Sequence, residues 1–130
     1  MARTRILYVE DNAANLALVR KVLEHGGRYE VVGAATGEEG LDVATARPPA
    51  LILLDLDLPG IDGFELARRL RAGASTAAIP LVAISASVMK HEREQAIAAG
   101  CVRFIEKPFD IGELRAVVEH ALLSNGNDEA

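Results

Sequence analysis

The chain has 130 residues, half of them hydrophobic and a quarter charged, which is the composition of one globular domain and not of a disordered chain. A formal net charge of −5 and the absence of tryptophan argue against direct binding of nucleic acid. No apolar run has the length of a membrane span, and the basic N-terminus turns acidic too soon for a signal peptide. The single cysteine, Cys101, excludes an internal disulfide, and we expect a packed, unreactive thiol in a cytoplasmic protein.

Strand-like and helix-like patterns alternate five times along the chain. Apolar runs of strand length cover residues 5–10, 29–35, 51–55, 80–85 and 102–106. Helical spacing of apolar residues follows over 16–23, 36–44, 64–71, 88–99 and 110–122. Thr36 with Glu39 predicts a cap for the second of these helices, and Asp110 with Glu113 predicts a cap for the fifth. Since parallel strands need crossover helices, this order predicts an α/β fold, a doubly wound (βα)5 arrangement with a five-stranded parallel sheet. We expect one domain over residues 1–124 and a flexible tail over 125–130.

Acidic, hydroxyl and basic side chains stand where four of the predicted strands end. Glu10 and Asp11 follow the first strand, Asp55 ends the third, Ser85 ends the fourth and Lys107 follows the fifth. The carboxyl ends of parallel strands meet at one edge of the sheet, which is where sites lie in open α/β folds. We therefore expect three carboxylates, one hydroxyl and one ammonium group to converge.

Three carboxylates held close together repel one another. At about 5 Å and an effective dielectric constant near 20, each pair costs roughly 3 kcal/mol. Lys107 supplies only one positive charge, so a divalent cation is needed to balance Glu10, Asp11 and Asp55. Clustered carboxylate oxygens suit Mg²⁺, and the sequence thus predicts a magnesium site at this edge.

The same group of residues suits phosphoryl transfer. An ionised Asp55 beside Mg²⁺ and Lys107 is placed to attack a phosphorus atom, because both cations stabilise charge on the transferring oxygens. The Ser85 hydroxyl would donate a hydrogen bond to one of those oxygens. No separate general base is needed, since the carboxylate is already ionised.

Four segments surround these residues, in the order ILYVEDN, LILLDLDLPGIDGFEL, IPLVAISAS and FIEKPF. In residues and spacing they resemble the receiver domain of two-component response regulators over nearly the whole chain. The acidic pair departs slightly from the family pattern, with Glu10 and Asp11 in place of the commoner double aspartate. The turn Pro59–Gly60 follows the phosphoacceptor segment, as in the family.

The resemblance implies a flavodoxin-like receiver fold and a defined role for each site residue. Asp55 would accept a phosphoryl group from a histidine kinase or a histidine phosphotransfer protein, with Lys107 and Ser85 as catalytic partners. The resemblance also implies Mg²⁺ bound by Glu10, Asp11, Asp55 and Asp57, with Glu10 acting through water and Asp57 through its backbone carbonyl. A cis peptide bond is expected before Pro108.

The resemblance further implies how phosphorylation would be signalled. Ser85 would move toward the acyl phosphate, and Phe104 would repack as an aromatic switch. The altered surface would comprise the fourth helix, the fifth strand and the fifth helix, and includes Met89, His91, Glu106 and Phe109. Two positions that tune phosphoryl lifetime in the family are Asp57 and Ser87, and Asp57 could either help to hold the metal or repel the phosphoryl group.

Several alternatives remain open from the sequence. The DLDLP segment resembles half of the motif of haloacid-dehalogenase-type phosphatases, but it lies on the third strand and lacks the following threonine or valine. A receiver that no longer accepts phosphate and acts only as an interaction module is a second alternative. We expect a non-enzymatic, stand-alone regulator that contacts a downstream protein as a monomer or weak dimer and binds neither nucleic acid nor membrane. A receiver excised from a hybrid histidine kinase would have almost the same sequence features, and it remains a third alternative.

Overall fold

The computed structural model describes residues 3–58, 62–86 and 90–128, and its elements alternate between strand and helix throughout. The bounds are β1 (Thr4–Val9), α1 (Ala13–Glu24), β2 (Tyr29–Ala34), α2 (Gly37–Ala46), β3 (Leu51–Asp55), α3 (Gly63–Ala72), β4 (Leu81–Ser85), α4 (Lys90–Ala98), β5 (Cys101–Glu106) and α5 (Ile111–Asp128). The strands form one parallel sheet in the order β2-β1-β3-β4-β5. The predicted α/β fold class with a five-stranded parallel sheet is therefore confirmed.

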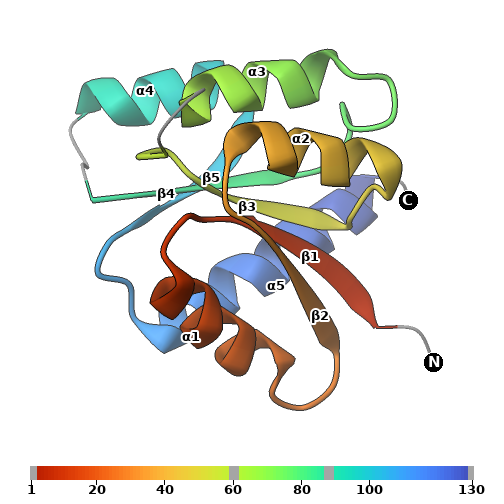
Figure 1. Ribbon diagram of the computed structural model, residues 1–130, viewed down its shortest axis with the longest axis vertical. Coiled ribbons are helices and arrows are strands. Elements are labelled where there is room, and N and C mark those ends of the chain that lie inside the picture. The colour runs from red at the N-terminus through yellow and green to blue at the C-terminus, as the bar shows by residue number, and fades with distance from the viewer. Residues whose placement is uncertain (1–2, 59–61, 87–89, 129–130) are drawn as a thin grey trace.

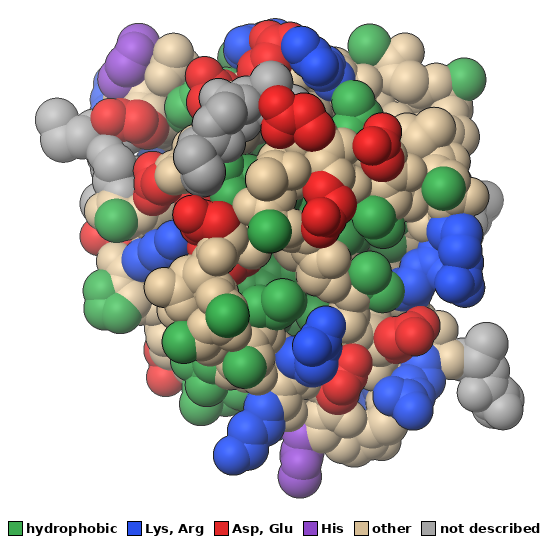
Figure 2. Space-filling view, viewed as in Figure 1, with side chains coloured by type: hydrophobic (Ala, Val, Ile, Leu, Met, Phe, Trp, Pro, Cys, Tyr) green, Lys and Arg blue, Asp and Glu red, His purple; other side chains and the backbone are tan. Residues whose placement is uncertain are grey.

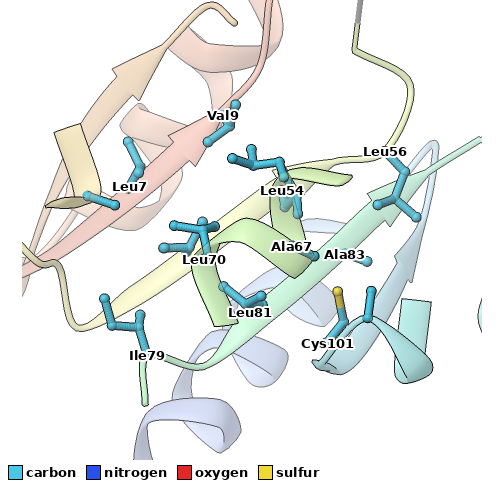
Figure 3. Packing of buried hydrophobic residues seen from close by; sticks show 14 of the residues in the cluster. Leu7, Val9, Leu54, Leu56, Ala67, Leu70, Ile79, Leu81, Ala83 and Cys101 are labelled. Atoms are coloured by element: carbon cyan, nitrogen blue, oxygen red, sulfur yellow. The ribbon is translucent and has the colours of Figure 1, made fainter. Parts of the chain in front are cut away.

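Helices cover both faces of the sheet. Figure 1 shows α2, α3 and α4 over one face and α1 and α5 over the other. Two buried hydrophobic clusters fill the space between these layers, and successive residues of one strand belong to opposite clusters because strand side chains alternate. Leu7 and Leu54 pack beneath α2, α3 and α4 (Figure 3), whereas Tyr8 and Leu53 pack on the side of α1 and α5. The sheet is thus buried on both faces, as the apolar run of β3 indicates.

The ends of the helices follow from local capping. The Thr36 hydroxyl accepts from the backbone N–H of Glu39 at 3.1 Å, and the Glu39 carboxylate accepts from the backbone N–H of Ala35 at 3.0 Å. The Asp110 carboxylate accepts from the backbone N–H of Glu113 at 3.0 Å at the start of α5. The predicted caps of α2 and α5 are therefore confirmed.

Helices α1 and α5 differ most in extent from the ranges that the sequence predicts. Helix α1 begins at Ala13, earlier than the apolar pattern suggests, because the Asn12 side chain caps it by accepting from the backbone N–H of Asn15 at 3.0 Å. The backbone of α5 is helical to Asp128, while the division into a domain over 1–124 and a tail over 125–130 stays a prediction. The expected first residues of α4, Val88 and Met89, lie outside the described residues, as do Pro59–Gly60 and Ser87.

Cys101 is buried at the start of β5, where only 5% of its surface is exposed. Burial raises the pKa of its thiol to about 11, with the nearby charge of Arg71 acting in the opposite direction. The thiol therefore stays protonated at neutral pH, as expected for a packing residue. Within the described residues, no helix has both the length and the apolar character that crossing a membrane requires.

Leu53 in the centre of β3 offers a test of the buried sheet. Its side chain is fully buried, so Leu53→Ala should lower the free energy of unfolding by about 2–5 kcal/mol through lost burial and a residual cavity. Urea unfolding monitored by circular dichroism measures this change. The matched control is Leu123→Ala, which removes the same atoms from a side chain that is 63% exposed and should change stability by less than about 0.5 kcal/mol. Equal losses in the two variants would contradict the packing described here.

Candidate functional site

The carboxyl ends of the parallel strands form one edge of the sheet, which lies on the left in Figure 1. Glu10 and Asp11 follow β1, Asp55 ends β3, Ser85 ends β4 and Lys107 follows β5. The central position of β1 and β3 in the sheet places their last residues side by side. Local strand and helix formation alone would not bring these side chains together, because they come from distant parts of the sequence.

Three carboxylates meet at this edge. One carboxylate oxygen from each of Glu10, Asp11 and Asp55 lies within 4.8 Å of the other two. Glu10 and Asp55 are each only 2% exposed, whereas Asp11 is open to solvent. At this separation each pair of ionised groups repels by about 3 kcal/mol at an effective dielectric constant near 20. The cluster therefore has oxygen ligands in place for a metal ion and an electrostatic reason to bind one.

The Glu10 carboxylate is fixed by donors that the sequence analysis did not single out. Its Oε1 atom accepts from the Tyr8 hydroxyl at 2.9 Å and from the Asn15 side-chain amide at 3.1 Å. Its Oε2 atom accepts from the backbone N–H of Asn12 at 3.2 Å. Tyr8 could have been noticed, since a tyrosine two residues before Glu10 points to the same face of the sheet as that residue.

Tyr8 is held in its protonated form by its surroundings. Burial raises the pKa of its phenol, and the charge of Glu10, the hydrogen bond to Glu10 and the charge of Asp55 raise it further. The neutral phenol can therefore donate a hydrogen bond to the Glu10 carboxylate over the whole physiological range of pH. The buried carboxylate thus keeps a donor, which lowers the cost of its burial.

Lys107 is the cation of the site. Its Nζ atom donates to Oδ2 of Asp55 at 2.8 Å and lies 3.7 Å from Oε1 of Glu10. Burial disfavours the charged ammonium, but the hydrogen bond from Lys107 to Asp55 and the charges of Asp55, Glu10 and Asp57 outweigh it and raise the pKa of Lys107. Lys107 therefore stays charged and offsets part of the repulsion among the carboxylates. The peptide bond between Lys107 and Pro108 is cis, as expected.

Asp57 connects the ends of β3 and β4. Its backbone N–H donates to Oδ1 of Asp55 at 2.8 Å, so both oxygens of Asp55 have a donor. Its carboxylate accepts from the Ser85 hydroxyl at 3.3 and 3.4 Å and from the backbone N–H of Ala86 at 3.3 Å. The side chain of Asp57 is therefore directed to the Ser85 side of the site, and the close acidic group found among the described residues does not include it.

Phe104 is apart from the carboxylates. Its ring is partly buried against the hydrophobic cluster beneath α4, and the guanidinium carbon of Arg93 lies 5.5 Å from the ring centroid. This arrangement is the core packing expected of an aromatic residue, with a cation over one face of its ring. The switch role expected for Phe104 remains a prediction.

Gly63 allows α3 to start directly beside the end of β3. A Cβ atom at this position would lie 2.6 Å from the Cα atom of Leu56 and 3.0 Å from the backbone oxygen of Asp55. Only glycine fits without moving the backbone next to Asp55. The start of α3 is fixed by Asp62, whose carboxylate accepts from the backbone N–H of Glu65 at 2.8 Å.

The arrangement places a buried carboxylate, a lysine and oxygen atoms that could hold a metal ion at one edge of a doubly wound α/β domain. This combination is compatible with the class of α/β domains in which a phosphoryl group is transferred to a carboxylate. Residues 6–119 match the model of the response regulator receiver domain. The chain therefore belongs to the family of response regulator receiver domains, which are phosphorylation-activated signalling domains.

Individual relatives agree with this family. The polar-differentiation response regulator DivK of Brucella ovis is 36% identical over 106 residues, which cover 82% of this chain and 85% of that protein. A CheY-like receiver domain protein from Methanospirillum hungatei is 27% identical, with a TM-score of 0.90 and coverage of 98% of this chain and 99% of its own. The receiver domain of the sensor histidine kinase PA1611 from Pseudomonas aeruginosa is 30% identical, with a TM-score of 0.85 and coverage of 93% and 98%, and holds a magnesium ion in its active-site cleft.

The raised pKa of Lys107 predicts how the site contributes to stability at high pH. A lysine in the unfolded chain titrates near 10.4, and Lys107 in the folded protein titrates higher. The stability that its charge provides is therefore complete below about pH 10.4 and is lost as the pH rises through the pKa of the folded state. The difference in free energy of unfolding between the wild type and Lys107→Met should be constant near neutrality and should shrink in alkaline solution.

Urea unfolding across this range of pH measures the difference, and titration of other groups common to both proteins cancels. The control repeats the comparison in an Asp55→Asn background, where the hydrogen-bonded carboxylate is gone and the alkaline decline should be smaller. A difference that stays constant into strongly alkaline solution would show that Lys107 is not stabilised by these carboxylates.

Proposed function

We propose that this domain accepts a phosphoryl group on Asp55 from a phosphohistidine of a histidine kinase or a histidine phosphotransfer protein. The observation that carries the proposal is the pairing of the buried Asp55 carboxylate with Lys107 at 2.8 Å, inside a group of three carboxylates. An Asp55 oxygen forms the new bond to phosphorus while the bond from phosphorus to the histidine nitrogen breaks. The imidazole leaves with that electron pair and takes up a proton from solvent.

Lys107 and Asp57 prepare the acceptor for this step. The positive charge of Lys107 balances the negative charge of Asp55. Because the lysine side chain is flexible and partly exposed, its ammonium group can shift from the carboxylate to a phosphoryl oxygen. The backbone N–H of Asp57 holds the other Asp55 oxygen at 2.8 Å, which fixes the orientation of the carboxylate. The ionised acceptor needs no general base.

We propose Mg²⁺ as the ion of the site. Glu10, Asp11 and Asp55 would hold it together with the backbone carbonyl of Asp57, and Glu10 would do so through water since its oxygens already accept three hydrogen bonds. When bound, Mg²⁺ would supply positive charge to the oxygens of the transferring phosphoryl group. Two charges from the ion and one from Lys107 match the three carboxylates.

Ser85 and Asp57 would couple the acceptor to the rest of the protein. A phosphoryl group on Asp55 brings new acceptor oxygens near the Ser85 hydroxyl and the Ala86 backbone N–H, both of which are now bonded to the Asp57 carboxylate. These donors would exchange Asp57 for the phosphoryl oxygens, so that the end of β4 moves. Phe104 would repack in response, next to Arg93.

The signal would reach a downstream protein through the surface of α4, β5 and α5. Glu106 and His91 are exposed on this surface, Phe109 is partly exposed, and Met89 lies outside the described residues. Ile97 and Val102 add exposed apolar area, at 69% and 55% exposure. Such side chains suit a transient protein contact, and the protein would act as a monomer or a weak dimer.

The family assignment leaves the haloacid-dehalogenase alternative without support. We propose that the domain catalyses only its own phosphorylation and dephosphorylation, in the cytoplasm, with no turnover of other substrates and without binding nucleic acid or membrane. A receiver that no longer accepts phosphate would lack one of the acceptor, the lysine or the acidic ligands, and all three are present in this chain. The stand-alone and hybrid-kinase settings both remain compatible with the relatives described above.

Phosphorylation by acetyl phosphate tests the acceptor. The wild type with Mg²⁺ should gain the mass of one phosphoryl group, because acetyl phosphate can transfer its phosphoryl group directly to the Asp55 carboxylate. Asp55→Asn should abolish the gain. The matched control is Asp57→Asn, which makes the same chemical change two residues away and should still gain one phosphoryl group. Persistent phosphorylation of Asp55→Asn in intact-protein mass spectrometry would contradict the proposal that Asp55 is the acceptor.

Thermal unfolding tests the metal site. Magnesium at roughly ten times its dissociation constant should stabilise the folded wild type by about 1.4 kcal/mol and raise its melting temperature by about 5 °C. Asp11→Asn should remove most of this increase because it deletes the solvent-exposed ligand. Asp42→Asn, at an exposed aspartate of α2, is the control and should keep the increase. An increase of equal size in Asp11→Asn, at constant ionic strength, would contradict the proposed ligands.

A further inference from the structure

A second charged feature lies at the opposite edge of the sheet, where the strands begin. A cavity of about 920 Å³ opens there between the start of β1, the end of α1 and the segment that joins α2 to β3. We call it the arginine cavity, and it is lined by Arg3, Thr4, Arg5, Arg20, Glu24, Glu30, Val31, Arg47, Pro48, Pro49 and Ala50. Figure 2 shows blue side chains on the lower right of the view, around the starts of β1 and β2, with red side chains between them.

The charge of this cavity is opposite to that of the whole protein. Four arginines and two glutamates line it, which leaves a net charge of +2, whereas the chain carries −5. None of the four arginines lies within ion-pair distance of a carboxylate among the residues that the structure describes. Their positive charge is therefore available to a ligand.

Backbone carbonyls, not carboxylates, hold two of these guanidinium groups. Arg5 donates from Nη2 to the backbone oxygens of Arg47 and Pro48, the latter at 3.3 Å. Arg20 donates from Nε to the backbone oxygen of Val31 at 3.3 Å. A carbonyl fixes the position of a guanidinium group without neutralising it, and an arginine has five N–H donors, so several remain for a bound anion.

The acidic residues of the cavity offset only part of this charge. The Glu24 carboxylate accepts a hydrogen bond from the backbone N–H of Val31 at 2.8 Å, which fixes it against β2. Glu30 is exposed, and no ion pair of its carboxylate with an arginine occurs within the described part of the chain. The two glutamates instead restrict which anions can bind, since a ligand must carry enough charge to outweigh them.

We propose that the arginine cavity binds a small molecule that carries at least two phosphate groups. Arginine forks match the geometry of phosphate oxygens, and a net charge of +2 calls for a ligand with more than one negative group. The volume falls in the range of ordinary ligand pockets and exceeds that of pyrophosphate alone, which favours a ligand of nucleotide size. The cavity lies at the other end of the strands from Asp55, about 16 Å away by strand length, so this proposal is independent of phosphorylation.

Titrations of the magnesium-free, unphosphorylated protein with inorganic pyrophosphate, ATP and citrate test the proposal by NMR. We expect pyrophosphate and ATP to bind saturably at millimolar or lower concentration, with ATP the tighter ligand, and to shift the backbone amides of Thr4, Arg5, Val31 and Ala50. Absence of saturable binding would overturn the proposal. So would shifts confined to Asp57, Ala86 and Lys107, because they would place the anion at the other edge of the sheet. Citrate binding as tightly as pyrophosphate would overturn the preference for phosphate.

Matched substitutions separate the cavity from a general charge effect. Arg47→Gln and Arg20→Gln should each weaken the binding of ATP by about tenfold, because each removes a charge-assisted contact. Glu30→Gln should strengthen it. Lys21→Gln is the control, since it removes the same charge from the residue next to Arg20 without altering the lining, and should leave the affinity within about twofold. Equal weakening by Lys21→Gln would overturn the proposal, and thermal unfolding of each variant verifies that it folds.

Discussion

The ion pair between Lys107 and Asp55, 2.8 Å long, is the interaction on which the rest of the site depends. Two buried carboxylates and a third at the surface stand close enough to repel one another strongly, and Lys107 is the cation that lies among them. Its charge is costly to bury, and the same carboxylates that need it raise its pKa. The buried carboxylates and the charged lysine therefore stabilise each other. One positive charge does not balance three carboxylates, which explains why the site suits a divalent ion.

The residues around this pair keep the charges fixed without neutralising them. Glu10 is surrounded by a phenol, a side-chain amide and a backbone N–H, and all of these are neutral donors. Asp55 receives a backbone N–H on the oxygen that Lys107 does not contact. Neutral donors satisfy buried oxygens yet leave the negative charge intact. This is what a site must do if it is to attract a cation and to attack a phosphorus atom.

The two edges of the sheet differ in charge, and the fold makes this separation possible. All strands run in the same direction, so every loop that follows a strand lies at one edge and every loop that precedes a strand lies at the other. The clustered carboxylates lie where β1 and β3 end, while the arginines of the cavity, which form no ion pair within the described residues, lie where the strands begin. The buried apolar residues of the sheet lie between the two groups, and neither group neutralises the other.

The sequence by itself determined the alternation of strands and helices, the caps at Thr36 and Asp110 and the strand ends that carry Asp55 and Lys107. These features are local, since they depend on residue spacing and on contacts a few positions apart. Only the tertiary structure decided that Tyr8 and Asn15 donate to Glu10, that Asp57 accepts from the Ser85 hydroxyl, and that arginines from separate parts of the chain line one cavity. Such contacts depend on the direction of a side chain and on the register between strands, which the order of residues along the chain does not specify.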